Sequence, residues 1–305
     1  MESSNKYPSI NRVLVTSFIV DITDVLLNVA VAVLSGSVVM LSQALQGGSD
    51  LIASGLLIIG LKRSRRPSDK NYPFGYGKEL YFWTMMAALV MLEITATLSF
   101  YLGYKRFIDP QPVHNIYLAY AVLIFGLITN SYAAYLSSRR LLGKRSPKAI
   151  FSVFSRSVLI ETKTALVLDI MGSGASILGL LALFVFQATG DFRFDGLGAM
   201  SIGVMLALLS AILLDGIKDM LVGRKASDEV ERSISEAALN TEHVKNVMDL
   251  KTMHIGASSL LINIEVHVDS KLKTSEIEHV TDRIKKNISD AVPSAKHIQV
   301  EIETI

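Results

Sequence analysis

The sequence of 305 residues contains no cysteine, only seven prolines and one tryptophan. Without cysteine, the chain can form neither a disulfide bond nor a thiolate-ligated metal site. It also lacks a secretory signal, because its polar start, MESSNKYPSINR, has no short apolar core followed by a small-residue cleavage site. We therefore expect the first apolar segment to remain in the mature protein.

Polar residues are also scarce over most of the chain. Half of the residues are hydrophobic and the mean hydropathy is +0.41, which is too apolar for an ordinary soluble domain. The apolar residues are concentrated before residue 223. We therefore predict an all-α transmembrane domain over residues 1–222 and a small α/β cytoplasmic domain over residues 223–305. The net charge of +2 gives no indication of a nucleic-acid partner, and none is expected.

Long apolar runs are what the chain has in abundance. A helix needs about 20 mostly apolar residues to cross a bilayer, and six segments meet this length. They cover residues 13–34, 39–61, 80–104, 116–137, 157–187 and 197–221. Six buried helices of a soluble protein are a poor alternative, since soluble core helices rarely reach this length six times in one chain.

Basic residues are gathered in two of the connecting loops, and the other loops are short and poor in Lys and Arg. The first basic loop contains Lys62, Arg63, Arg65, Arg66, Lys70 and Lys78, and the second contains Arg139, Arg140, Lys144, Arg145, Lys148 and Arg156. Because basic loops stay on the cytoplasmic side, both termini are predicted to be cytoplasmic. We expect an integral membrane protein of the cell membrane.

The cytoplasmic domain is predicted to follow the order αββαβ. Residues 226–240 form an amphipathic helix with Ser227 as its N-cap, and residues 274–292 form a second helix capped by Thr274. Three segments alternate apolar and polar residues as half-buried strands do, at residues 247–256, 260–270 and 297–305. A module this small gains stability by pairing, so we predict a homodimer through this domain.

Ionisable side chains inside membrane spans are functional candidates because their burial in lipid is costly. Helical spacing puts several of them on common faces: Asp21, Asp24 and Asn28 in the first span, Gln46 and Asp50 in the second, and Glu161 and Asp169 in the fifth. Carboxylates outnumber Lys163, so some are expected to be protonated or to face water or a cation. Asp21 and Asp24 either line a solvated vestibule or belong to a site. Glu93 either holds helices together or lies on a pathway.

Small residues surround Asp50 and Asp169. GGS precedes Asp50 and GSGAS follows Asp169, and we expect these to be matching halves of one close helix contact. Oxygen ligands one turn apart on two such helices can complete the shell of a single ion. The pattern predicts a cation site between the second and fifth spans, with these two acids as its anionic core.

Four segments carry motifs that belong together. They are LSGSVVMLSQALQGGSDLI at the first two spans, RPSDKNYPFGYGKELYFW before the third, LVLDIMGSGASILGLL in the fifth and FRFDGLGAMSIGVML at the start of the sixth. Over nearly the whole chain, they resemble the cation diffusion facilitator family of divalent-metal/proton antiporters. The resemblance implies six spans, a ferredoxin-like cytoplasmic domain, and a transporter rather than an enzyme.

Two positions depart from the family's four-ligand transport site. Gln46 stands where the family has His or Asp four residues before Asp50, and Ala165 stands at the same place before Asp169. Asp50 and Asp169 match the family pattern. The resemblance therefore implies only half of the usual site, although an amide oxygen of Gln46 can still coordinate an ion.

Three explanations are open for these departures. The missing ligands come from Asp24 and Asn28, from Thr164, or from water. Alternatively, the ion is harder than zinc, such as Mn²⁺, Fe²⁺ or Mg²⁺, because no span contains a histidine. The third explanation is that transport is lost. The ion, a substrate rather than a cofactor, is thus left open between Mn, Fe, Zn and Mg.

The resemblance also implies metal binding at the dimer interface of the cytoplasmic domain. Position on the strands and on the second helix gives the candidate ligands Glu265, His279, Glu301 and Glu303. A solvated acidic face is the alternative for the glutamates. His254 and His267 lie on neighbouring strands and are candidates for a close pair.

The function predicted from these features is export of a divalent cation by alternating access, coupled to proton uptake. Asp50 and Asp169 bind the cation when ionised and carry protons when empty. The expected partners are the cation, the proton, the lipid bilayer and a second copy of the chain, without a cofactor. A non-transporting scaffold or heterodimer partner and a passive channel are the alternative functions.

Overall fold

The computed structural model describes residues 10–143, 145–156 and 160–303. Predictions that concern residues 1–9, Lys144, residues 157–159 or residues 304–305 lie outside the described residues. So do the side chains of residues 10–18, Val20, residues 155–156, Ile160 and Glu161. The chain forms two compact units, one of Met1–Leu61 with Phe82–Ile217 and one of Lys62–Tyr81 with Lys218–Ile305.

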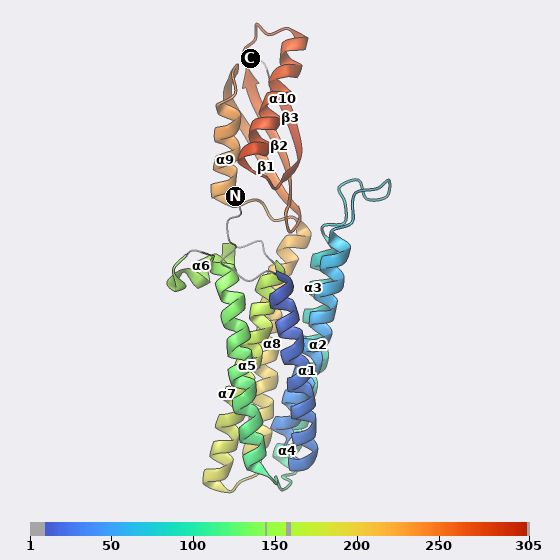
Figure 1. Cartoon of the computed structure of the whole chain (residues 1–305), viewed down its shortest axis with the longest axis vertical. Helices are drawn as coiled ribbons and strands as arrows, with labels where there is room; N and C mark the ends of the chain where they lie inside the picture. The colour runs from blue at the N-terminus through green and yellow to red at the C-terminus, as the bar shows by residue number, and fades with distance from the viewer. Residues whose placement is uncertain (1–9, 144, 157–159, 304–305) are drawn as a thin grey trace. The chain divides into compact units, whose positions relative to one another are not determined.

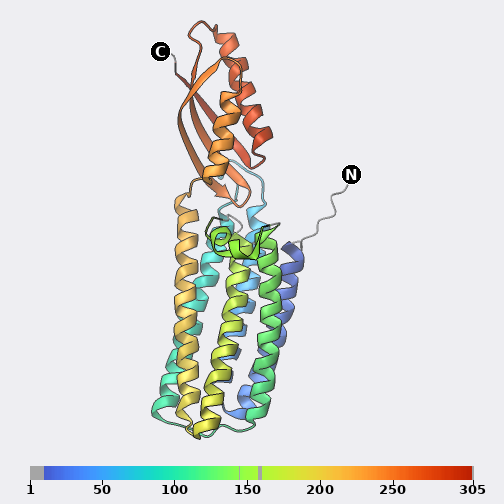
Figure 2. The ribbon, with the colours of Figure 1, turned by 90° about the vertical axis from the view of Figure 1, so that its left-hand side faces the viewer.

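The first unit is a bundle of long helices that run side by side (Figures 1 and 2). Most of its residues lie in α1 (Ile10–Ser35), α2 (Val38–Ser64), α3 (Glu79–Val90), η1 (Met91–Ala96), α4 (Thr97–Ile108), α5 (Ile116–Leu142), η2 (Pro147–Ala149), α6 (Ile150–Arg156), α7 (Ile160–Thr189) and α8 (Arg193–Val222). Five segments of the described chain are long and apolar enough to cross a membrane: Val38–Ser64, Glu79–Ile108, Ile116–Leu142, Thr162–Thr189 and Arg193–Val222. The 26-residue helix α1 stands where the first span is predicted.

The third span changes its winding halfway along. α3 passes into the π-helix η1, which carries Glu93, and then into α4, within one apolar segment of 30 residues. Glu93 is exposed on the bundle surface, away from the buried acids described below. π-helical turns often mark functional positions, but here the polar side chain points outward rather than toward the acids.

Glycines bring α4 and α8 into contact through their backbones. A Cβ on Gly103 would lie 2.6 Å from the carbonyl oxygen of Gly196, and a Cβ on Gly196 would lie 2.6 Å from that of Gly103. Farther along, a Cβ on Gly203 would lie 2.8 Å from the carbonyl oxygen of Ala96. Small residues of this kind allow membrane helices to approach closely, so α4 and α8 form a tightly packed pair.

The second unit contains the α/β domain in the predicted order αββαβ (Figure 1). Its elements are α9 (Asp228–Leu239), β1 (Val244–Gly256), β2 (Ser259–Val268), α10 (Thr274–Ala291) and β3 (Ala295–Glu303). The sheet order is β1-β2-β3, with β1 antiparallel and β3 parallel to β2. A parallel pair needs a crossover, and α10 provides it.

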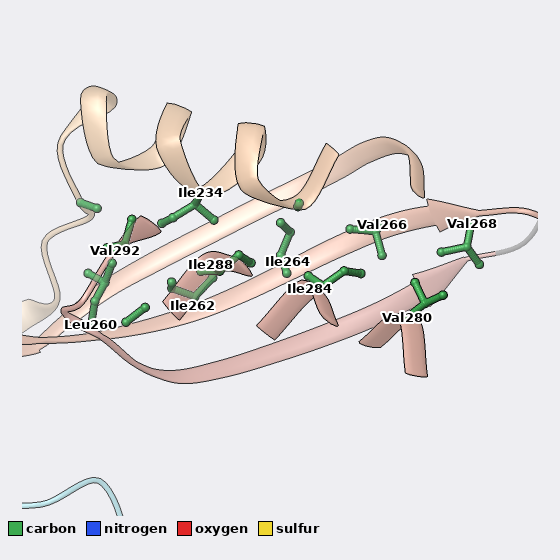
Figure 3. Packing of buried hydrophobic residues seen from close by; sticks show 13 residues of the cluster. Ile234, Leu260, Ile262, Ile264, Val266, Val268, Val280, Ile284, Ile288 and Val292 are labelled. Atoms are coloured by element: carbon green, nitrogen blue, oxygen red, sulfur yellow. The ribbon is translucent and has the colours of Figure 1, made fainter. Parts of the chain in front are cut away.

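One face of this sheet packs against α9 and α10 to form the core (Figure 3). Alternate residues of β2, including Ile262, Ile264 and Val266, meet Ile234 of α9 and Ile284 of α10. Each such side chain contributes about 1.5–3 kcal/mol on burial. The period of two along β2 therefore leaves its other residues on the opposite face.

The helix starts agree with the sequence in one case. Ser227 caps α9, since its Oγ accepts a hydrogen bond from Val230 N at 3.4 Å. Thr274, predicted as the cap of the second helix, is instead its first helical residue. Lys273 precedes the helix there, and Glu276 Oε2 accepts from Lys273 N at 2.7 Å. The glutamate of the first turn thus satisfies the backbone N–H of the residue before the helix, and Thr274 is not the cap.

The loop between α2 and α3 folds with the second unit. Asp69 accepts from the Tyr76 hydroxyl at 2.6 Å and from Tyr72 N at 2.9 Å, and these hydrogen bonds lower the pKa of its carboxyl group. Gly77 lies against the β1–β2 turn, where a Cβ would be 2.8 Å from the Cα of Gly256. The glycine in this motif therefore permits a close backbone contact.

Candidate cation site

The helix α2 carries Gln46 and Asp50 one turn apart, and both side chains are buried. Gln46 Nε2 donates to Asp50 Oδ2 over 3.5 Å, which is a long hydrogen bond. Gln46 Oε1 and Asp50 Oδ1 have no hydrogen-bond partner among the described residues. The helix thus presents two unsatisfied oxygens inside the bundle.

The helix α1 adds Asp21, Asp24 and Asn28, which are also buried rather than in a solvated vestibule. Ser54 Oγ donates to Asp21 Oδ2 at 2.8 Å and so joins α2 to α1, one turn beyond Asp50. Asn28 Nδ2 donates to the backbone oxygen of Asp24 at 2.7 Å. Within the described part of the chain, Asp24 Oδ1 and Asn28 Oδ1 accept no hydrogen bond.

The helix α5 supplies neutral donors to acids on two neighbouring helices. Asn130 Nδ2 donates to Asp24 Oδ2 of α1 at 2.7 Å. Ser137 Oγ donates to Asp169 Oδ2 of α7 at 2.9 Å. Asn130 and Ser137 are seven residues apart and therefore lie on one face of α5.

The carboxylates of Asp21, Asp24, Asp50 and Asp169 are all buried in this bundle. Asp50 lies within electrostatic range of Asp21, Asp169 and Asp24. The buried lysine of α7, Lys163, has its ammonium group over the ring of Phe154 at 4.8 Å. The cost of burying several carboxylates in one bundle is offset when they bind a proton or a cation.

The small residues beside the acids do not form the single contact that the sequence suggested. Gly47 faces α1, where a Cβ would lie 2.9 Å from Val25 Cγ2. Gly172 faces α5, where a Cβ would lie 2.6 Å from Asn130 Cγ. Gly48 has no atom within 4 Å of such a Cβ. The prediction of matching halves is wrong, because the two segments make room for different neighbours.

Neither Gln46 nor Ala165, the two positions that depart from the family's transport site, provides a charged ligand. Ala165 is buried one turn before Asp169 and offers no ligand atom. Among the described residues, no three His, Asp or Glu side chains are grouped so that they could hold a metal ion. A cation bound at Asp50 would therefore depend on neutral oxygens, and Gln46 and Asn28 carry unsatisfied ones.

Three residues of the region were missed or undervalued in the sequence. Asp21 was not among the predicted ligands, and the hydroxyl groups of Ser54 and Ser137 were not considered. A simple signal was available for one of them, since Ser54 follows Asp50 by four residues and so shares its helix face. No comparable spacing links Ser137 to an acid on its own helix.

The cytoplasmic candidates separate into two groups. Asp249, Glu265 and Glu301 are direct cross-strand neighbours, and Glu303 lies two residues beyond Glu301 on β3. Burial and the neighbouring Glu303 carboxylate raise the pKa of Glu265. His279 is exposed on α10, which packs on the other face of the sheet. One chain thus brings the three candidate glutamates together but does not bring His279 to them.

The two histidines proposed as a close pair lie far apart. His254 is opposite Leu260, whereas His267 is opposite Glu303. Seven residues along β2 separate these positions, or about 23 Å, so the prediction of a close pair is wrong. Burial, and secondarily the charge of Arg224, lower the pKa of His254.

Curated relatives match most of this chain at low identity. The human mitochondrial proton-coupled zinc antiporter SLC30A9 is 23% identical over 309 residues, covering 88% of this chain and 54% of the relative. The magnetosome protein MamB of Paramagnetospirillum magneticum is 22% identical over 286 residues, covering 93% of this chain and 90% of the relative. The chain thus spans about half the length of the zinc antiporter.

Among solved structures, the nickel form of a MamM C-terminal domain variant matches 26% of this chain and 99% of that domain, at 18% identity and a TM-score of 0.25. Two family models together match nearly the whole chain. That of the cation efflux transmembrane domain matches residues 14–220, and that of the cytoplasmic domain of cation efflux proteins matches residues 226–305. The chain therefore belongs to the cation diffusion facilitator family of integral membrane proteins.

Proposed function

We propose that this protein moves a divalent cation across a membrane by alternating access and returns protons in exchange. The transmembrane domain of residues 1–222 would hold the cation at Asp50 and Asp169. The basic loops, both termini and the domain of residues 223–305 would face the cytoplasm, so that transport is efflux.

The observation that carries this proposal is the set of unsatisfied oxygens inside the bundle. Asp50, Gln46, Asp24 and Asn28 each have a buried oxygen without a hydrogen-bond partner among the described residues. Buried acceptors are nearly always paired, because leaving one unpaired costs about 1–3 kcal/mol. Several buried oxygens without a hydrogen-bond partner, on the adjoining helices α1 and α2, are better explained by binding of a cation than by a purely structural role.

The donor set favours a hard cation. Every candidate ligand in the spans is a carboxylate, amide or hydroxyl oxygen, the class that suits Mn²⁺ and Mg²⁺ better than zinc. The Gln46 amide now turns its nitrogen toward Asp50. A bound cation would require the amide to rotate and present its oxygen, which is the unsatisfied atom.

Proton exchange follows from the crowding of the acids. When no cation is bound, mutual repulsion among Asp50, Asp21, Asp169 and Asp24 favours protonation of part of the group. Cation binding would expel these protons. The human relative is itself named a proton-coupled zinc antiporter, which supports the same coupling here.

The test is transport by the purified protein in liposomes that contain a pH-sensitive dye. Mn²⁺, Fe²⁺, Mg²⁺, Zn²⁺ and Cd²⁺ are added in turn across a pH gradient. We expect cation-driven proton flux with a hard cation, and its loss in Asp50→Asn and Asp169→Asn. Glu93→Gln is the matched control, since it changes a carboxylate of a span that lies exposed outside the group.

Three outcomes would contradict the proposal. Unchanged flux in both aspartate variants would remove the acids from the mechanism. Cation flux driven by voltage and indifferent to the pH gradient would favour a passive channel. Absence of flux with all five cations, in protein that elutes as a single species, would favour a scaffold or heterodimer partner that keeps only the fold.

The cytoplasmic domain is proposed to pair two copies of the chain. Glu265, Glu301 and Glu303 form one acidic patch in a single chain, and His279 of the partner subunit is the candidate that would complete it. Like charges opposite each other on adjacent strands destabilise a sheet. A cation or a partner surface that neutralises them would reverse this cost.

A further inference from the structure

Asp195, in the motif at the start of α8, is fully buried and bonded to another helix. Its carboxylate accepts hydrogen bonds from Ser37 Oγ at 2.5 Å, from Val38 N at 2.8 Å and from Val39 N at 3.2 Å. Val38 and Val39 are the first residues of α2. Asp195 therefore caps α2 from a distant helix and places a negative charge at its positive end.

Arg106 of α4 completes this arrangement. Its Nη1 lies 3.5 Å from Asp195 Oδ2 and donates to the Gln111 carbonyl at 3.0 Å, and its Nη2 donates to the Gly36 carbonyl at 2.7 Å. The arginine side chain is only 12% exposed. One guanidinium thus joins α4, the α1–α2 turn and the residues after α4 to the carboxylate that caps α2.

The ion pair of Arg106 and Asp195 connects a tightly packed pair of helices, α4 and α8, to the N-terminus of α2. Arg106 and Asp195 stand on α4 and α8, which touch through Gly103 and Gly196 without intervening side chains. The attached helix, α2, carries Asp50 twelve residues beyond Val38, or about 18 Å along its axis. The position of Asp50 along the bundle is thus set partly by this bonded end of α2.

Two polar side chains of α2 between its N-terminus and Gln46 lack hydrogen-bond partners among the described residues. Ser42 and Gln43 lie on α2 between Val38 and Gln46, and both are buried. Ser42 Oγ and Gln43 Nε2 make no hydrogen bond among the described residues. Unpaired buried groups of this kind are places where a water molecule can bind.

We propose that Asp195 and Arg106 are positioning residues that hold α2 in place and close the bundle at the end where α2 begins. Release of the cation at that end requires the bonds of Asp195 to α2 to loosen. This inference deepens the proposed transport function and rests on it for the identity of what passes, but the closure itself is a property that can be measured without transport.

The natural absence of cysteine provides the test. A reporter, Gln43→Cys, is reconstituted in liposomes and exposed to a water-soluble methanethiosulfonate reagent. We expect slow modification in the otherwise unchanged chain. In Arg106→Gln and in Asp195→Asn the rate should rise at least about tenfold, because each change leaves one partner of a buried ion pair without the other. The conservative Arg106→Lys should restore most of the protection.

A second reporter separates local opening from unfolding. Leu206 is fully buried in the middle of α8. Modification of the reporter Leu206→Cys should therefore stay slow in every variant. An equal rise at both reporters, or no rise at Gln43→Cys in either variant, would overturn the proposal. If Asp195→Asn is not recovered from membranes, Arg106→Gln decides, since it removes the ion pair with Asp195 and keeps the carboxylate itself.

The outcome is also distinguishable from failure of the proposed function. The chain could carry no cation in the liposome assay while Gln43→Cys is still modified faster in Arg106→Gln and Asp195→Asn. That result would support the closure by Asp195 and Arg106 and contradict the proposed transport. In a transporting chain, the two variants should lower turnover more than they raise the KM for the cation, because they alter the opening step rather than the ligands of Asp50.

Discussion

Asp24 is kept inside an apolar bundle by an amide rather than by a basic side chain. Asn130 Nδ2 donates to Asp24 at 2.7 Å and to the Gly126 carbonyl at 2.9 Å. A neutral donor steadies the carboxylate without cancelling its charge. The acid therefore keeps its attraction for a proton or a cation, which an arginine at position 130 would remove.

The variant Gly172→Ala tests the hydrogen bond from Asn130 to Asp24. The new Cβ would lie 2.6 Å from Asn130 Cγ, so the amide must shift and its hydrogen bond to Asp24 must weaken. We expect a loss of about 1–3 kcal/mol in stability, together with a higher KM for the cation. Thermal unfolding in detergent and liposome transport measure the two effects. Gly48→Ala, which meets no atom within 4 Å, should change neither.

Restoring imidazoles tests the choice of cation. In the double variant Gln46→His with Ala165→His, two nitrogen ligands join Asp50 and Asp169. We expect transport of Zn²⁺ to rise relative to Mn²⁺, because imidazole suits zinc better than an all-oxygen site does. The ratio of the two initial rates in liposomes is the measurement. An unchanged ratio would count against the hard-cation hypothesis.

His254 gives the domain of residues 223–305 a dependence on pH. Burial and Arg224 lower its pKa in the folded state, so its contribution is fully present above the unfolded pKa of about 6.5 and is lost as the pH falls. We expect urea unfolding midpoints to decline below that pH. In His254→Gln this decline should disappear.

Spacing along one helix predicts which polar residues share a face, but not what they meet across the bundle. The four-residue step from Gln46 to Asp50 is fixed by helix geometry and was predictable. Ser54 and Asp21 are 33 residues apart, and their contact depends on how each helix is rotated about its axis. Because most sides of these helices are apolar, the few polar residues do not fix that rotation closely enough to predict the contact.

At the scale of elements, an apolar run predicts a helix but not the winding within it. The segment MLEITA adopts a π-helix without any proline or glycine to mark it. The predicted span of residues 157–187 is helix from Ile160 to Thr189, with the short α6 before it. The helix ends were predictable because loops and charges bound them, whereas an internal change of winding follows from packing.

The contact between α4 and α8 carries a prediction of its own. In Gly103→Ala the Cβ would meet backbone atoms of Gly196 and Met200, which cannot rotate away as side chains can. The helices must separate, and we expect a loss of about 1–3 kcal/mol in stability. Thermal unfolding in detergent checks it. Gly216→Ala on α8, with no atom within 4 Å, is the matched control and should unfold like the unchanged chain.

At the scale of the whole molecule, the two units are organised by different rules. The second has one layer of helices on a sheet, and the alternation along β2 made its order αββαβ predictable. The first depends on contacts between helices that are apolar on most sides. Its helices were predictable one by one, while the neighbours of Gly47 and Gly172 were not.

A fragment of residues 223–305 tests the proposed division of the chain. It contains the entire cluster of α9, α10 and β2, and we expect it to fold and to pair. Circular dichroism should give a cooperative unfolding transition, and light scattering after gel filtration should give the mass of two copies. A folded monomer would confine the dimer proposal to the full chain, and an unfolded fragment would contradict the boundary.

The facing glycines of α4 and α8 also bear on how different states of this protein are to be compared. The contact is made by backbone atoms, so it does not depend on rotamers or on the protonation of any side chain. Structures with and without cation should therefore be superposed on these two helices. Displacements of α2 or α7 measured in that frame would report movement of the acids themselves rather than of the whole bundle.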